Sequence, residues 1–142
     1  MVFSSSTEYA IRAVTYLALL PTGTLAGARE ISRAENIPMP FLSKILQKLG
    51  RRKVVRSFKG QRGGYELARP ADKITLQDLV AATNGDELEG RCVLGLSQCD
   101  EDYPCPLHDH WKGIRVQLVT MLEQTTVADL ARTAAIRKGE ER

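Results

Sequence analysis

Two short helical patterns joined by a proline-containing turn constrain this chain more than any other feature of its sequence. The first pattern runs from about Ala28 to Glu35 and stops at Asn36. The second follows Pro38 and runs to about Arg51. Its apolar face consists of Phe41, Leu42, Ile45, Leu46 and Leu49. Two short helices in this order are typical of a helix-turn-helix.

A glycine-rich hairpin is predicted directly after this pair of helices. Residues 54–58 and 65–67 have the composition of short strands, and the Gly-Gln-Arg-Gly-Gly sequence of residues 60–64 forms the turn between them. Glycine backbone beside Lys59 and Arg62 can approach a phosphate chain closely. The sequence therefore predicts a mostly α-helical protein with a winged helix-turn-helix whose wing has two strands.

Charge is distributed unevenly between the two halves of the chain. Residues 1–73 carry 13 Lys and Arg against 5 Asp and Glu, whereas residues 74–142 carry 7 against 12. A basic half of this kind suits the phosphate backbone of DNA. The candidate DNA-binding residues are the polar and basic side chains of the second helix and the wing, namely Ser43, Lys44, Gln47, Lys48, Arg51, Lys59, Gln61 and Arg62.

Four further helices are predicted, over about residues 7–20, 75–84, 106–124 and 126–136. Thr75 with Asp78, and Thr126 with Asp129, have the spacing of capping boxes at the start of two of them. In the longest helix, apolar residues alternate at spacings of four and three, which predicts a dimerisation helix that pairs with a second copy of the chain. These residues are Leu107, Trp111, Ile114, Leu118 and Met121.

These patterns divide the chain into four parts. Residues 1–84 are predicted to form a winged helix-turn-helix DNA-binding domain, and residues 85–106 a cysteine-rich loop that binds a cluster. Residues 107–136 are predicted to form the dimerisation helix and a C-terminal helix, and residues 137–142 a frayed tail. A two-fold homodimer with one reading helix per chain should bind a near-palindromic operator, with half-sites about 34 Å apart.

All three cysteines lie in or at the end of the predicted loop, with six residues between Cys92 and Cys99 and five between Cys99 and Cys105. Three thiols cannot all pair within one chain, so a metal site is favoured over a disulfide scaffold. Zinc sites usually use closer cysteine pairs, whereas these gaps suit a 2Fe-2S or 4Fe-4S cluster. A cluster normally takes four protein ligands, and His108 and Glu8 are the candidates for the fourth.

Several other classes of protein are disfavoured. The chain contains no Gly-rich phosphate loop after a strand and no Ser-His-Asp order in the right context, so an enzyme is not predicted. No apolar run approaches the roughly 18 residues of a membrane-spanning helix. Residues 1–8 carry no Lys or Arg that would mark a secretory signal, so the sequence predicts a cytoplasmic protein that does not bind a membrane.

Several short motifs follow one another along the chain. They are Glu8-Tyr9-Ala10-Ile11-Arg12-Ala13, Ile37-Pro38, Phe41-Leu42, Lys59-Gly60, Gly63-Gly64-Tyr65, the three-cysteine loop and Thr126-Val127-Ala128-Asp129-Leu130. In this order they resemble the Rrf2 family of bacterial winged-helix regulators, and within it the iron–sulfur-binding IscR and NsrR types. The resemblance implies a homodimer that binds DNA and holds an iron–sulfur cluster on Cys92, Cys99 and Cys105. It places His108 at the histidine ligand of the first type and Glu8 at the N-terminal carboxylate ligand of the second.

The implied function is transcriptional regulation, and repression in particular, in response to iron–sulfur status, nitric oxide or redox stress. Ser43 and Lys44 stand where IscR-like proteins often carry Glu and Gln, so the resemblance does not supply the operator sequence. The alternative is a winged-helix regulator with structural zinc or a cysteine thiol switch. A remote alternative is an electron-carrying iron–sulfur protein, which would leave the helix-turn-helix and the wing without a role.

Overall fold

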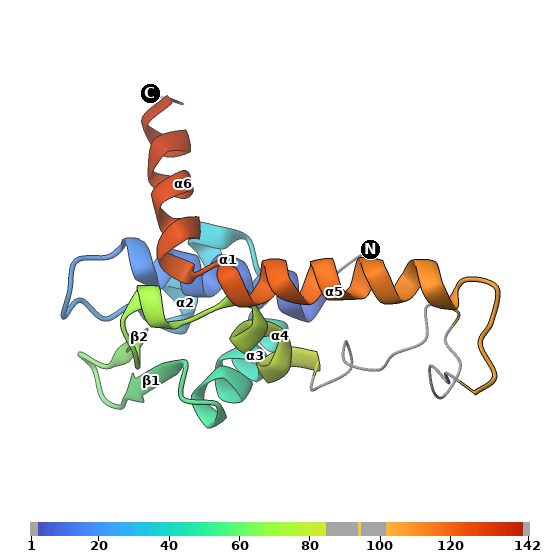
Figure 1. The fold of residues 1–142 in the computed structure, drawn as a ribbon. Helices are drawn as coiled ribbons and strands as arrows, with labels where there is room; N and C mark the ends of the chain where they lie inside the picture. Colours follow the sequence, from blue (N-terminus) through green and yellow to red (C-terminus); the bar gives the residue numbers. More distant parts are fainter. Residues whose placement is uncertain (1–2, 85–93, 95–101, 141–142) are drawn as a thin grey trace.

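Helices dominate the computed structural model, which describes residues 3–84, 94 and 102–140 (Figure 1). The predicted fold class, a mostly helical winged helix-turn-helix, is confirmed. No helix within the described ranges is both long and apolar enough to cross a membrane. The elements are α1 (Ser5–Leu19), α2 (Ala28–Glu35), α3 (Met39–Arg51), β1 (Val55–Phe58), β2 (Gly64–Leu67), the 3-10 helix η1 (Ala71–Lys73), α4 (Leu76–Asn84), α5 (His108–Gln124) and α6 (Val127–Glu140).

Helices α1 to α4 pack around one apolar core, and the strands β1 and β2 lie against its edge (Figure 1). The core-facing residues of α3 are those that the sequence predicts, except that Phe41 is 56% exposed. Phe41 lies in the first turn of α3 and contacts the ring of Tyr9 on α1 instead of entering the core. The buried side chains of α3 are Leu42, Ile45, Leu46 and Leu49, each of which stabilises the fold by about 1.5–3 kcal/mol when fully buried.

The start of α1 is fixed by the hydroxyl groups of Ser4 and Thr7. The Ser4 hydroxyl accepts a hydrogen bond from the backbone N–H of Thr7 at 3.2 Å, so the helix begins at Ser5, two residues before the predicted start. The Thr7 and Thr83 hydroxyls are hydrogen-bonded at 2.6 Å, and Ser4 donates to the side-chain oxygen of Asn84 at 2.8 Å. These bonds tie the start of α1 to the end of α4.

The wing is an antiparallel pair in which Val55 lies opposite Leu67 and Phe58 opposite Gly64. Its outer face carries a cross-strand ion pair between Arg56 and Glu66, at 2.7 Å. A third segment joins the sheet through Ala26, which exchanges two backbone hydrogen bonds with Tyr65 of β2, at 2.8 and 3.1 Å. The wing is therefore attached to the segment that leads into α2, which the sequence analysis did not predict.

Both predicted capping boxes are present. The backbone N–H of Thr75 donates to the Asp78 carboxylate at 2.9 Å, and the Asp78 N–H donates to the Thr75 hydroxyl at 3.2 Å. The Thr126 and Asp129 pair repeats this pattern at 2.9 and 3.1 Å. Hydrogen bonds from the backbone and hydroxyl of Thr126 hold the pKa of Asp129 below its usual range.

The two capping boxes lie side by side, although 51 residues separate their threonines. The backbone N–H of Leu76 donates to the carbonyl of Thr125 at 3.0 Å, and that of Val127 donates to the carbonyl of Ile74 at 2.8 Å. Thr75 and Thr126 form a short antiparallel bridge between these bonds. This joint, defined as residues 74–76 with residues 125–127, attaches α6 and the end of α5 to the domain formed by α1 to α4 and the wing.

Helices α5 and α6 project from the domain in different directions (Figure 1). Each contributes one fully buried apolar side chain near the joint, Leu122 from α5 and Val127 from α6. The sequence predicts that the last helix ends near Ile136 and that residues 137–142 fray, but α6 continues to Glu140. Arg and Lys at positions 137 and 138 are good helix formers and favour the negative end of the helix dipole, which accounts for the longer helix.

The capping box at Thr75 leads to a stability prediction. Thr75→Ala removes the hydroxyl that accepts from Asp78 and should lower the free energy of unfolding by about 1 kcal/mol. The control is Thr120→Ala, because the Thr120 hydroxyl is exposed in the middle of α5 and bonds only to the carbonyl four residues earlier. Urea unfolding at one protein concentration should separate the two variants. Equal stabilities would contradict the role of Thr75 at the joint.

Candidate nucleic-acid interface and metal-binding region

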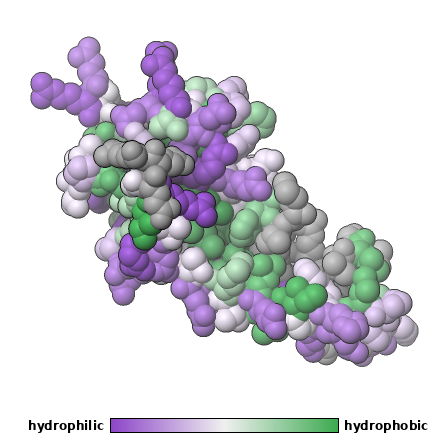
Figure 2. Space-filling model, turned by 90° about the horizontal axis from the view of Figure 1, so that it is seen from above, coloured by the Kyte–Doolittle hydropathy of each residue, from purple (hydrophilic) through white to green (hydrophobic). Residues whose placement is uncertain are grey.

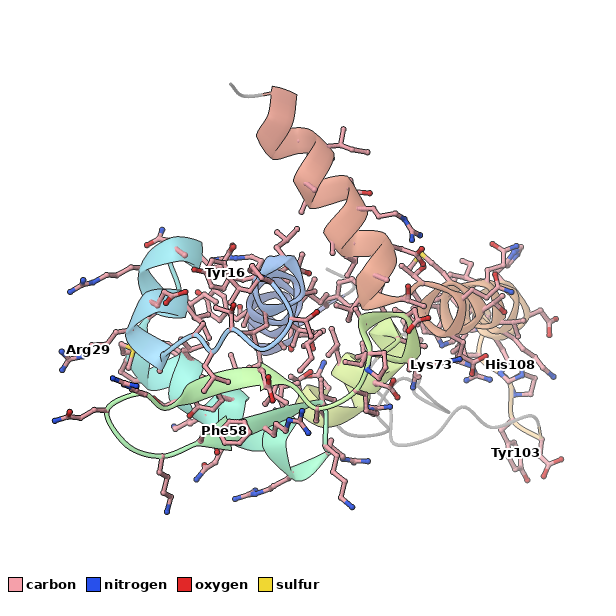
Figure 3. The ribbon with its side chains drawn as sticks, turned by 90° about the vertical axis from the view of Figure 1, so that its left-hand side faces the viewer. Tyr16, Arg29, Phe58, Lys73, Tyr103 and His108 are labelled. Atoms are coloured by element: carbon pink, nitrogen blue, oxygen red, sulfur yellow. The ribbon has the colours of Figure 1, made fainter. Side chains whose placement is uncertain are left out.

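The outward face of α3 carries the polar and basic residues that the sequence singles out. The buried residues Leu42 and Leu49 fix the opposite face in the core, so the rotation of α3 about its axis is set by packing. In Figure 3, nitrogen-tipped side chains project from the edge of the molecule formed by α3 and the wing. The exposed residues of this face are Ser43, Lys44, Gln47, Lys48 and Arg51.

A shallow hollow separates α3 from the wing. Ser43, Lys44 and Gln47 line its helical side. Ser57 of β1 and Tyr65 of β2 line the opposite side, so the structure brings the two predicted DNA-binding elements together around one concave surface. Lys48 and Arg51 continue the face toward the end of α3 and do not line the hollow.

The tip of the wing presents Lys59, Gln61 and Arg62, all exposed. The backbone turns sharply here, and the N–H of Gly63 donates to the carbonyl of Gly60 at 3.0 Å. A Cβ atom at Gly63 would lie 2.0 Å from the carbonyl oxygen of Phe58, which only a residue without a side chain avoids. The tight turn places the two cations at the end of the wing.

Among the residues that the structure describes, no acidic side chain pairs with the cations of this surface. Ion pairs form at Arg56, Arg69 and Arg132, none of which is a candidate DNA-binding residue. A cluster of exposed, unpaired cations on one face is costly unless solvent or an anionic partner compensates it. The unpaired cations are Lys44, Lys48, Arg51, Lys59 and Arg62.

Two arginines that the sequence analysis missed hold the elements of this surface in place. The Arg12 guanidinium donates to the backbone carbonyls of Glu35 and Asn36 at the end of α2. Arg69 donates to the carbonyls of Lys53, at 3.2 Å, and Lys73, at 3.4 Å. Neither role has a signal in the sequence, because each partner lies 4 to 24 positions away and is a backbone atom.

A tyrosine also links the first two helices. The Tyr16 hydroxyl donates to the Glu30 carboxylate at 2.5 Å. This hydrogen bond, with smaller contributions from burial and from the Glu30 charge, raises the pKa of Tyr16 to about 12. Arg12 and Tyr16 together orient α2 on α1, and therefore the turn that leads into α3.

The cysteine-rich region is only partly described. Cys92 and Cys99 lie outside the described residues, whereas Cys105 is half-buried and His108, the first residue of α5, is buried. The backbone N–H of His108 donates to the carbonyl of Cys105 at 3.0 Å, which places the thiol and the imidazole on one turn. Thiolate sulfur and imidazole nitrogen are both good ligands for iron and zinc.

Glu8 lies in the first turn of α1, half-buried, and is not in this group. Figures 1 and 3 both place the start of α5 away from α1. No three His, Cys, Asp or Glu side chains of the described residues come close enough together to hold a metal ion. Cys105 and His108 therefore share one backbone turn at the start of α5, whereas Glu8 lies on a different element.

The fold and the basic surface define a winged-helix DNA-binding protein. A family model described as "Rrf2: Iron-dependent Transcriptional regulator" matches residues 3–133. The chain belongs to the Rrf2 family of transcriptional regulators, which bind DNA and are not enzymes.

Relatives and solved structures agree with this assignment. An HTH-type transcriptional regulator of Aquifex aeolicus is 38% identical over 92% of this chain and 91% of its own length. CymR, the global cysteine regulator of B. subtilis, has a similar structure, with a TM-score of 0.79 and 24% identity over 92% of this chain and 96% of CymR. IscR of T. potens has a TM-score of 0.74 and 20% identity over 93% of this chain and 87% of IscR.

Proposed function

We propose that this protein binds a near-palindromic operator as a homodimer and acts as a repressor whose DNA affinity depends on an iron–sulfur cluster. The observation that carries the DNA-binding part is the set of unpaired cations on α3 and the wing. In a helix-turn-helix, the second helix enters the major groove, where Ser43, Lys44 and Gln47 would face the bases. Lys59, Gln61 and Arg62 would contact the adjacent groove and its phosphates.

The salt dependence of DNA binding tests the role of the wing. Arg62→Ala should reduce the slope of log K against log salt concentration by about 0.9, because one phosphate contact is lost. Arg137→Ala is the matched control, since Arg137 is exposed on α6, which points away from the wing, and the slope should not change. Fluorescence anisotropy with a labelled duplex gives both slopes. Equal slopes in the two variants would show that the wing does not contact phosphate.

The homodimer is supported by apolar side chains on α5 that the single chain leaves uncovered. Leu107, Ile114 and Met121 are 42%, 56% and 46% exposed, and their spacing of seven residues puts them on one line along the helix. Figure 2 shows hydrophobic residues along the elongated part of the molecule that α5 forms. The neighbouring Trp111 and Leu118 are half-buried. A second copy of α5 would cover this line by two-fold symmetry.

A charge placed on this line should separate the two chains. Ile114→Glu is expected to shift the sedimenting species from twice the chain mass toward the 15.7 kDa of one chain. Thr120→Glu introduces the same charge on a solvent-facing position of α5 and should leave the dimer intact. Wild-type protein that sediments as one chain at micromolar concentration would contradict the homodimer.

The cluster is supported by the chemistry of the donors near the start of α5. Cys105 and His108 supply a thiolate and an imidazole on one turn, and we assign Cys92 and Cys99 as the other two ligands from the sequence pattern alone. When bound, a 2Fe-2S or 4Fe-4S cluster would supply a redox- and nitric-oxide-reactive centre. Glu8, which the single chain holds away from Cys105, would reach the cluster only from the second chain.

Iron and sulfide content of anaerobically purified protein tests this assignment. His108→Ala should lower the iron and sulfide bound per chain and change the visible absorption, because a ligand is lost. His110→Ala is the control, since this histidine is exposed two residues further along α5. If Glu8→Ala lowers the iron and sulfide content and His108→Ala leaves it unchanged, the fourth ligand is Glu8 instead.

One experimental result would exclude an iron–sulfur cluster and favour zinc or a thiol switch. Protein that stays colourless and iron-free after cluster reconstitution contradicts the iron–sulfur proposal. One zinc per chain in that case would support the structural-zinc alternative, and thiols that oxidise reversibly would support a thiol switch.

A further inference from the structure

The first turn of α3 carries an exposed apolar surface at the place where a helix-turn-helix reads DNA. Pro38, Met39, Pro40 and Phe41 are four consecutive apolar residues, and all four are exposed. Met39 is 36% and Phe41 56% exposed, although the next residue, Leu42, is completely buried. Large apolar side chains gathered on a surface mark a binding site more often than isolated ones do.

The position of these residues on α3 connects them with the basic face. Pro40 lies four residues before Lys44 and seven before Gln47, so the three form one line along the outward side of the helix. Met39 precedes Ser43, which lines the hollow beside the wing, by four residues. The apolar first turn is therefore continuous with the surface that we propose for DNA contact, and it is the end of a recognition helix that usually meets base edges.

The side chains of this turn offer no hydrogen-bonding group to a base, and its one free backbone donor is the N–H of Met39. The backbone N–H groups of Phe41 and Leu42 both donate to the carbonyl of Pro38, at 3.1 and 3.0 Å. Pro40 has no N–H, and none of the four side chains carries a strong donor or acceptor. The turn also cannot hold a phosphate through these amides, because they are already used.

The way in which these side chains can read a base in the major groove is apolar contact. The C5-methyl group of thymine is the apolar feature among the groups that the four base pairs present there. We infer that Met39 and Pro40 determine operator specificity by contacting thymine methyl groups, an inference that rests on the proposed DNA-binding function. Each half-site would then carry thymine where α3 enters the groove. Two prolines in the turn restrict its backbone and keep the contact surface rigid.

Phe41 has a different role within the same turn. Its ring lies 6.3 Å from that of Tyr9, centre to centre, and the Arg12 guanidinium lies 5.2 Å from the centre of the Tyr9 ring on α1. These contacts support the first turn of α3 against α1. We therefore assign Phe41 as a positioning residue and Met39 and Pro40 as the residues that touch the base.

The test needs an operator, which selection from a random duplex library with the full-length protein supplies. Each thymine of the selected half-site is then replaced, one at a time, by deoxyuridine, which keeps the base pair but lacks the methyl group. At one or two positions per half-site the Kd should rise about fourfold, the change that corresponds to about 0.8 kcal/mol for one buried methyl-sized group. Cytosine at that position should bind more weakly still, and 5-methylcytosine should recover part of the loss.

Protein variants assign the effect to the first turn. In Met39→Ala and Pro40→Ala the ratio of the Kd for deoxyuridine to that for thymine should fall toward one. Lys44→Ala, four residues along the same face, should weaken binding to both duplexes equally and keep the ratio near four. Circular dichroism confirms that the variants are folded.

The outcomes separate this inference from the proposed function. Tight, sequence-specific binding with equal Kd values for thymine and deoxyuridine at every position overturns the methyl readout and leaves the regulator intact. A ratio that persists in both Met39→Ala and Pro40→Ala overturns the assignment to these residues. A library from which no sequence is enriched overturns the proposed function and this inference together.

Discussion

The structure depends on the joint where the starts of α4 and α6 pair. Two backbone hydrogen bonds, from Leu76 to Thr125 and from Val127 to Ile74, hold the segments together, and a capping box on each side begins a helix. Buried Leu122 and Val127 next to these bonds continue the core of the DNA-binding domain into α5 and α6. A movement of α5 about this joint would therefore reach the domain that carries α3. In the proposed function, this coupling would allow a cluster at one end of α5 to affect DNA affinity.

The recognition surface depends in turn on the packing of the core. Leu42, Ile45 and Leu49 fix the rotation of α3, while backbone contacts from Arg12 and Arg69 fix the segments on either side of it. Arg69 also lies 3.6 Å from the Asp78 carboxylate of the first capping box, so the corner between α3 and the wing is linked to the joint. Because Arg69 is half-exposed, its ion pair with Asp78 contributes little to stability. Its effect is on position, because it connects the wing with the element that carries α6.

Local features of the fold could be predicted from the sequence because their causes are local. The bounds of α2, the two capping boxes and the wing turn follow from Asn36, from the Thr-x-x-Asp spacing and from the glycines of residues 60–64. The bridge of Ala26 to β2, the joint itself and the 3-10 helix at residues 71–73 were not predicted. Pairing between distant segments leaves no periodic signal. No glycine or proline stands at positions 137 or 138 to end α6 after Ile136, and α6 continues through Gly139.

The candidate site also contains some features that could be predicted from the sequence and others that could not. Exposure of the eight predicted DNA-binding residues follows from helical periodicity and from the wing turn, so their common face could be anticipated. The apolar first turn of α3 was assigned to the core through Phe41, because periodicity does not distinguish an apolar residue that packs from one that faces outward at a helix end. The separation of Glu8 from Cys105 and His108 depends on how α5 leaves the domain, which only the three-dimensional structure gives.

The central claim is that α3 and the wing form the surface that binds duplex DNA. Amide hydrogen exchange of the full-length protein, measured with and without a selected operator duplex, tests it most directly. We expect slower exchange in residues 39–51 and 59–64 on DNA binding, and unchanged exchange in the outer turns of α6. Protection confined to α6 or to the outer face of α2, with exchange in α3 and the wing unaltered, would contradict it.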